Sequence, residues 1–166
     1  DNLYVIWLSE DEESSKLHIA SLSRDNGDIV WETDFEDVED RSEPVVHDGV
    51  LYLFAGGQAL AISTSDGSKK WGRDISYKQS IPSVGNNVMA VYNTGIDGAD
   101  RNKQLTVLNT DDGAVKWTEE ITHSISPIPT IVDGAVYLSQ GGSYGQAEEY
   151  GTWPRRQIHP RAIKAG

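Results

Sequence analysis

The chain has 166 residues, a length compatible with one domain, and its hydrophobic fraction of 37% is enough for a packed core. Its net charge of −12, from 26 acidic and 14 basic residues, repels phosphate backbones and anionic lipid. Composition therefore argues against nucleic acid and membrane surfaces as direct partners. The acidity itself has two interpretations: ordinary solubility, or adaptation to high salt, which screens the self-repulsion of an acidic shell.

The chain contains no cysteine, so disulfides, Cys-ligated zinc and thiol nucleophiles are excluded over its length. No apolar run reaches the ~18–20 residues that cross a bilayer. The sequence does not begin with Met, and its first residues, DNLYVIWL, read as a strand rather than a signal peptide. We expect the chain to be part of something longer.

The first predicted unit, residues 3–34, contains three strands. The apolar opening segment is followed by a second apolar strand, KLHIASLS (16–23). A turn phrase, DNGDIVW (25–31), then places Gly27 four residues before Trp31. Asn-Gly between strands is a strong hairpin signal, because glycine adopts positive φ without a steric penalty. We interpret this unit as the last three strands of one blade.

The second unit, residues 43–73, is predicted to form a complete blade of four strands. Its first segment, SEPVVHDG, contains Pro44, which fits a strand start or an edge strand, where no ladder donor is lost. The next strand, VLYLFA (50–55), is apolar at nearly every position rather than alternating, which predicts burial on both faces. After the strand QALAIST, the phrase SDGSKKW repeats the earlier spacing with Gly67 and Trp71.

The same order returns in residues 80–119 and begins again in an incomplete unit, residues 126–166. The third copy of the turn phrase, DDGAVKW, contains Gly113 and Trp117. The segments SIPSVGNN and SPIPTIVDG carry the proline expected of the first strand in each unit. The units therefore recur at a period near forty residues, which is typical of propeller blades.

This period predicts an all-β fold: a partial β-propeller of about three to four four-stranded antiparallel blades, part of a larger propeller of seven or eight blades. We interpret the tryptophans as structural, each wedged between blades from an outermost strand with its N–H bonded to a backbone acceptor. Ligand stacking is the less favoured alternative, because a ligand site is seldom needed three times. Two loops, residues 92–104 and 141–160, depart from the period, and both binding and neutral insertion stay open for them.

Several positions match a known repeat pattern. The matches in the best copy are Pro44, Asp48, Gly49, Tyr52, Ala61, Ile62, Gly67 and Trp71. Those in the last copy are Pro129, Asp133, Gly134 and Tyr137. The pattern resembles that of the quinoprotein-type, or PQQ-like, propeller repeat family, and the resemblance covers nearly the whole chain. It differs from WD-type repeats, in which Trp is followed by Asp at the strand end.

The resemblance implies two functions from different classes. The family includes quinone-dependent alcohol and sugar dehydrogenases, the outer-membrane-assembly lipoprotein scaffold, and many extracytoplasmic proteins without quinone. Its dehydrogenases carry a disulfide between adjacent cysteines, which this chain lacks, and calcium held by Glu, Asn and Asp, which spacing does not assign here. The resemblance also implies a location in the periplasm or at the cell surface, with lipid anchoring through sequence upstream as a further expectation.

The sequence contains few signs of a metal-binding or catalytic site. The four histidines stand singly in the sequence: His18, His47, His123 and His159. No pair has metal-ligand spacing, and His47 is interpreted as structural, with a channel-facing position as the alternative. Asp97 and Asp100 offer oxygen ligands, but their loop does not match the EF-hand pattern, so a plain hairpin loop is favoured over a calcium site. A Ser-His-Asp triad stays open because its members meet only in space, although no G-x-S-x-G elbow marks one.

The sequence therefore favours a non-catalytic scaffold that binds a protein or carbohydrate partner outside the cytoplasm. The alternative is part of a PQQ-dependent alcohol or sugar dehydrogenase whose catalytic blades lie outside this stretch. No catalytic, cofactor-binding or metal-binding residue is assigned, and PQQ and calcium are expected only under the alternative. Fold alone does not decide between the two, because function depends on sites carried by the fold.

Overall fold

The computed structural model of the protein describes residues 2–10, 14–75, 81–93, 104–120, 128–133, 135–138 and 161–164. Every regular element in these residues is a β-strand, and the strands form four antiparallel sheets. The prediction of an all-β fold built from antiparallel blades is confirmed. We number the sheets blade 1 to blade 4 in chain order.

Blade 1 has three strands, and blades 2 and 3 have four each. Blade 1 contains β1 (Asn2–Glu10), β2 (Ser15–Ser23) and β3 (Ile29–Glu36). Blade 2 contains β4 (Val45–His47), β5 (Val50–Ala55), β6 (Gln58–Ser63) and β7 (Lys69–Asp74). Blade 3 contains β8 (Ser83–Gly85), β9 (Val88–Asn93), β10 (Gln104–Asn109) and β11 (Val115–Glu120). The described part of blade 4 contains β12 (Thr130–Val132), β13 (Ala135–Leu138) and β14 (Arg161–Lys164). Within each sheet the strands pair in chain order.

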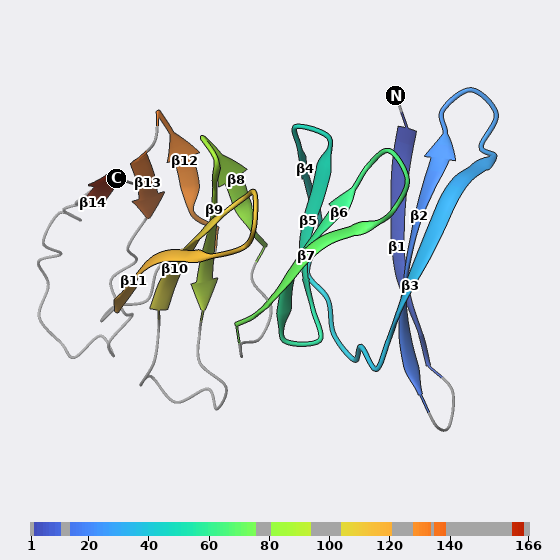
Figure 1. The fold of residues 1–166 in the computed structure, drawn as a ribbon, viewed down its shortest axis with the longest axis horizontal. Helices are drawn as coiled ribbons and strands as arrows, with labels where there is room; N and C mark the ends of the chain where they lie inside the picture. Colours follow the sequence, from blue (N-terminus) through green and yellow to red (C-terminus); the bar gives the residue numbers. More distant parts are fainter. Residues whose placement is uncertain are drawn as a thin grey trace, which may run out of the picture.

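The blades stand side by side in the order of the sequence, with their sheets facing one another (Figure 1). Three apolar layers fill the spaces between them: one between blades 1 and 2, one between blades 2 and 3, and one between blades 3 and 4. The core of the protein is thus the set of contacts between blades. A blade without a neighbour would leave one of these layers exposed to water.

The strand β5 explains how one blade serves two layers. All six of its side chains are buried, as the apolar sequence VLYLFA predicts. Because successive side chains of a strand point to opposite faces, Tyr52 and Phe54 enter the layer toward blade 3, while Leu51 and Leu53 enter the layer toward blade 1. Burying a large apolar side chain stabilises a fold by about 1.5–3 kcal/mol, so this strand contributes to both interfaces at once.

The turns that lead into the outermost strands have the same geometry in three blades. Gly27, Gly67 and Gly113 have φ of 77°, 74° and 68°, in the left-handed region that favours glycine. In each turn the glycine N–H donates to the carbonyl four residues earlier, at Ser23, Ser63 and Asn109. A register shift follows in every copy, so the outermost strand begins with an extra residue. The glycine is therefore required by the backbone of the turn.

The first strands of blades 2, 3 and 4 form the inner edge of the stack. β4, β8 and β12 are each the edge strand of their sheet, and β8 lies beside both β4 and β12. Each is immediately preceded by a proline: Pro44, Pro82 or Pro129. The predicted proline at a strand start is confirmed, since a residue without an N–H takes no donor from the ladder there.

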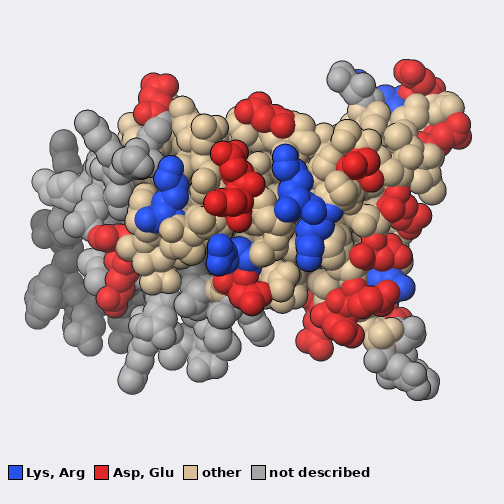
Figure 2. Space-filling view, in the orientation of Figure 1, with Lys and Arg blue, Asp and Glu red and all other residues tan. Residues whose placement is uncertain are grey.

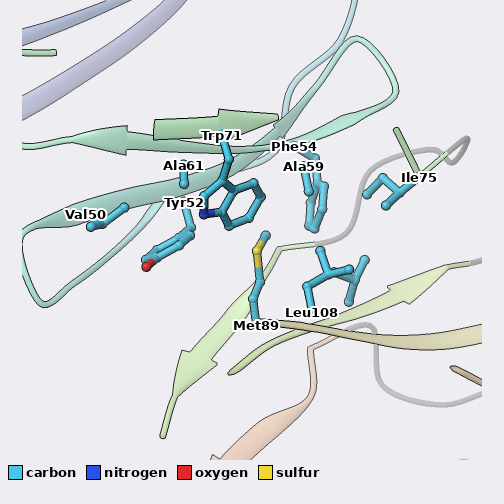
Figure 3. Packing of buried hydrophobic residues seen from close by; sticks show 10 residues of the cluster. Val50, Tyr52, Phe54, Ala59, Ala61, Trp71, Ile75, Met89 and Leu108 are labelled. Carbon is cyan, nitrogen blue, oxygen red and sulfur yellow. The ribbon is translucent and has the colours of Figure 1, made fainter. Parts of the chain in front are cut away.

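Trp71 lies at the centre of the layer between blades 2 and 3 (Figure 3). Tyr52 and Ala61 of blade 2 flank its indole, and Met89 and Leu108 approach it from blade 3. The Tyr52 and Trp71 rings are tilted at 48° with their centroids 6.0 Å apart. Burial raises the pKa of the Tyr52 phenol; a hydrogen bond with Thr110 opposes this rise, and the carboxylates of Asp111 and Asp48 add to it.

This raised pKa predicts a loss of stability at high pH. A free tyrosine ionises near pH 10, so above that pH the unfolded chain releases a proton that folded Tyr52 retains. The free energy of unfolding should then fall, by up to about 1.4 kcal/mol per pH unit. In Tyr52→Phe this fall should be smaller. Urea unfolding of both proteins between pH 9 and pH 11 measures the difference, and parallel curves would contradict the effect of burial.

Candidate functional site

Each buried tryptophan packs against the turn glycine of the following blade. The Trp31 indole lies over Gly67, and its Nε1–H donates to the Thr64 carbonyl at 3.0 Å. Trp71 lies over Gly113 in the same way and donates to the Thr110 carbonyl at 2.7 Å. We call this contact the indole–glycine contact. It joins residues from neighbouring copies of the repeat rather than the glycine and tryptophan of one copy.

These glycines are required for space as well as for φ. A Cβ on Gly67 would lie 2.6 Å from Cε3 of Trp31, and a Cβ on Gly113 would lie 2.6 Å from Cε3 of Trp71. Only a hydrogen fits in either position. The Arg73 Nε–H also donates to the Gly113 carbonyl at 2.9 Å, which adds a second link from blade 2 to that turn.

The two remaining predicted residues, Gly27 and Trp117, make no indole–glycine contact among the described residues. Gly27 has the same positive φ, but no described atom lies within 4 Å of the position of its Cβ. Trp117 is half-buried and packs in the layer between blades 3 and 4. Its Nε1 has no hydrogen-bond partner among the described residues. Gly27 thus offers the same turn without the indole above it.

The inner edge of the stack presents a nearly uncharged surface. We define the inner-strand surface as the strands Val45–His47, Ser83–Gly85 and Thr130–Val132. These strands contain no Asp, Glu, Lys or Arg, in a chain with a net charge of −12. Val46 and Val132 are 49% and 47% exposed. A hydrogen bond from the Ser83 hydroxyl to the Pro129 carbonyl connects blade 3 to the chain entering blade 4.

His47 is the one titratable side chain of these three strands. Its Nε2 lies 3.3 Å from the carboxylate of Asp48 in the adjoining turn. Asp48 has a φ of 46°, which matches the tight turn expected of the Asp-Gly pair. The histidine is half-exposed beside a carboxylate partner, as a structural histidine would be.

The inner-strand surface does not fit the group that a quinone-dependent dehydrogenase would hold. Calcium needs six to eight oxygen ligands, mainly from carboxylates, and these three strands supply neither carboxylates nor side-chain amides. Asp97 and Asp100 lie outside the described residues, as do His123, His159 and the loop 141–160. We therefore derive no step through a quinone or calcium.

His18 stands singly in the sequence, but the fold gives it two polar partners. The antiparallel register of blade 1 places His18 beside Asp34, with Nδ1 and Oδ1 2.8 Å apart, and Ser9 Oγ lies 2.8 Å from Nε2. The order is that of a Ser-His-Asp triad, but Ser9 lies within the regular strand β1 rather than on the sharp turn that exposes a nucleophile. One sequence signal marks the position: blades 2 and 3 have Gln58 and Gln104 where blade 1 has His18.

The comparisons with known proteins agree with this architecture. The family model described as "Outer membrane protein assembly factor BamB" matches residues 15–147. The chain belongs to this family of PQQ-like propellers. None of the curated proteins matches it.

Three solved structures share the fold of this chain at low sequence identity. BamB from Moraxella catarrhalis is 15% identical with a TM-score of 0.55, over 82% of this chain and 47% of that one. The quinohemoprotein alcohol dehydrogenase ADHIIG from Pseudomonas putida HK5 is 13% identical with a TM-score of 0.56, over 81% of this chain and 28% of that one. The computationally designed Ika4 protein is 11% identical with a TM-score of 0.57, over 98% of this chain and 92% of that one.

These likenesses show the fold alone. The prediction of a partial propeller is confirmed, and this BamB-family chain spans about half the length of the Moraxella catarrhalis structure. In the described part of the chain, no helix is long and apolar enough to span a membrane.

The indole–glycine contact predicts different costs for the same substitution at two turns. Gly27→Ala should destabilise the fold only by the cost of a left-handed backbone, about 1–2 kcal/mol. Gly67→Ala should cost about 1–3 kcal/mol more, because its methyl group would overlap the Trp31 indole. Urea unfolding followed by circular dichroism measures both variants. Equal losses would mean that the indole does not restrict the turn.

Proposed function

We propose that this BamB-family propeller is a non-catalytic assembly scaffold that binds protein outside the cytoplasm. The supporting observation is the inner-strand surface, which offers sheet edges and exposed valines to a partner. The family match over residues 15–147 supports assembly as the task, since the family is described as an outer membrane protein assembly factor.

The inner-strand surface suits a polypeptide partner. An edge strand has unpaired backbone N–H and C=O groups, and an added strand can satisfy them while its side chains contact those beside the edge. Val46 and Val132 supply apolar contacts near two such edges. The inner strands contain no Phe, Tyr or Trp on which a sugar could stack, so we favour a protein over a carbohydrate.

The negative charge of the chain favours binding at the inner-strand surface over binding elsewhere. The rest of the described surface is rich in Asp and Glu, so an anionic partner is repelled except where charge is absent. A partner that docks on the inner-strand surface avoids the desolvation of carboxylates, which is costly when they are left unpaired. The acidic exterior thus directs binding to the uncharged edge.

Site-specific cross-linking tests the proposal. A photo-reactive residue at Val46 in the full-length protein should form adducts, in the cells that make it, with proteins that assemble the outer membrane. The matched control is Val115, which is 48% exposed but lies on the outermost strand β11. Mass spectrometry of the adducts identifies the partner. Equal adducts from both positions, or none from Val46, would contradict a docking role for the inner-strand surface.

A dye-reduction assay tests the enzymatic alternative. The full-length protein, supplied with PQQ and calcium, should leave an artificial electron acceptor unreduced when alcohols or aldoses are added. Reduction that depends on both PQQ and substrate would overturn the scaffold proposal. A known quinoprotein dehydrogenase serves as the positive control for the reagents.

A further inference from the structure

A cluster of polar side chains lies on the face of blade 1 that is turned away from blade 2. Tyr4, Ile6 and Leu8 of β1 pack toward blade 2, so the alternating residues Trp7 and Ser9 point the other way. The register places Trp7 beside His18 and His18 beside Asp34. Glu32, two residues before Asp34 in the same strand, shares this face. We call His18, Glu32 and Asp34 the blade 1 cluster.

The other blades show which part of this cluster belongs to the repeat. Nine residues before the turn glycine, blade 1 has His18 and blade 2 has Gln58. Three residues after the tryptophan, blade 1 has Asp34 and blade 2 has Asp74. In blade 2 the Gln58 amide donates to the Asp74 carboxylate at 2.7 Å. A cross-strand polar pair is therefore common to both blades, and a histidine is not needed to make it.

Glu32 is the second departure from the repeat. The equivalent position, directly after the tryptophan, is Gly72 in blade 2 and Thr118 in blade 3. A Cβ on Gly72 would meet Gln58 Oε1 at 3.2 Å, so blade 2 has little room for a side chain there. Blade 1 thus differs from blade 2 at two positions of one small site, and both changes introduce a metal-ligating group beside an existing carboxylate.

The distances within the blade 1 cluster match a metal site. His18 Nδ1 lies 2.8 Å from Asp34 Oδ1 and 3.9 Å from Glu32 Oε1, and the three ligand atoms all lie within 4.8 Å of one another. Tetrahedral zinc with bonds of about 2.0–2.1 Å keeps its ligand atoms about 3.3 Å apart. The two distances from the imidazole lie on either side of this value, so small side-chain rotations would complete the site.

The surroundings of His18 hold its ring in the orientation that a ligand needs. Trp7 stacks on the imidazole with a centroid distance of 4.8 Å and an interplanar angle of 10°. With the proton on Nε2, that nitrogen donates to Ser9 Oγ and leaves the lone pair of Nδ1 directed at the two carboxylates. Such a partner on the second nitrogen is typical of metal-bound histidine. The Glu32 and Asp34 side chains are each 41% exposed, which leaves an open side for water.

We propose that His18 Nδ1, Glu32 and Asp34 bind a divalent transition-metal ion, with zinc the best match and the fourth position open to solvent. One imidazole and two carboxylates suit zinc, whereas calcium and magnesium prefer oxygen ligands alone. Two carboxylates balance the charge of the ion. Acidic side chains gather over the blade 1 end of the molecule (Figure 2), and their field raises the local concentration of cations.

Zinc titration of the chelator-treated protein tests this site. Calorimetry should detect one zinc ion per chain. His18→Gln should weaken binding by at least about tenfold and should still fold, because it recreates the Gln–Asp pair that blade 2 already has. Glu32→Gln should weaken binding to a similar extent. Glu36→Gln, a change in the same strand outside the cluster, should leave binding unchanged.

Tryptophan fluorescence gives an independent readout. Nickel bound at His18 lies beside Trp7 and should quench its emission, and Trp7→Phe should remove most of that quenching. Circular dichroism confirms that each variant is folded. The proposal is overturned if zinc does not bind the wild-type chain, or if His18→Gln and Glu32→Gln bind it as tightly as wild type.

Discussion

The structure depends on the contact between an indole of one blade and a bare glycine backbone of the next. Both described examples, Trp31 on Gly67 and Trp71 on Gly113, combine close packing with a hydrogen bond to a turn carbonyl. A tryptophan buries a large apolar surface and still satisfies its single polar group in this way. The contact fixes the distance and the angle between blades 1 and 2 and between blades 2 and 3, and the apolar layers at these two interfaces depend on that placement.

This arrangement connects the repeat to the proposed docking surface. Because consecutive blades are held in register at their outer turns, their first strands meet at the opposite, inner edge. The inner strands are short and free of acidic and basic side chains other than His47, whereas the outer strands carry many charges. The outer contacts therefore position the uncharged edge at which the proposed scaffold would bind its partner.

Much of the fold is predictable because the repeat is local. The turn glycines, the strand alternation and the prolines each reflect a backbone requirement within a few residues, so the sequence pattern identifies them. The partner of each tryptophan is different, since it lies in the following copy, about forty residues away. Sequence spacing groups Gly67 with Trp71, yet in the structure Gly67 contacts Trp31. Such pairing depends on how blades stack, which no local pattern encodes.

The blade 1 cluster was missed for a related reason. His18, Glu32 and Asp34 come together through the register of β2 and β3, and a shift of one residue would send a side chain to the other face. The repeat nevertheless offers a way to find such sites. His18 and Gln58 have the same structural role, because each pairs with an aspartate on the neighbouring strand. The fold therefore does not explain why blade 1 has a histidine at this position. Comparing copies within a chain therefore separates residues that maintain the architecture from residues that a particular blade has added.

A double-mutant cycle between Trp31 and Gly67 tests the central contact most directly. Gly67→Ala is measured in the wild-type chain and in a Trp31→Leu background, with the free energy of unfolding taken from urea titrations. If the indole causes the penalty, Gly67→Ala should cost clearly less in the Trp31→Leu background, falling to the cost of Gly27→Ala, with a coupling of about 1–3 kcal/mol. An unchanged cost in the two backgrounds would contradict the account, because the glycine would then be required only for the φ of its own turn.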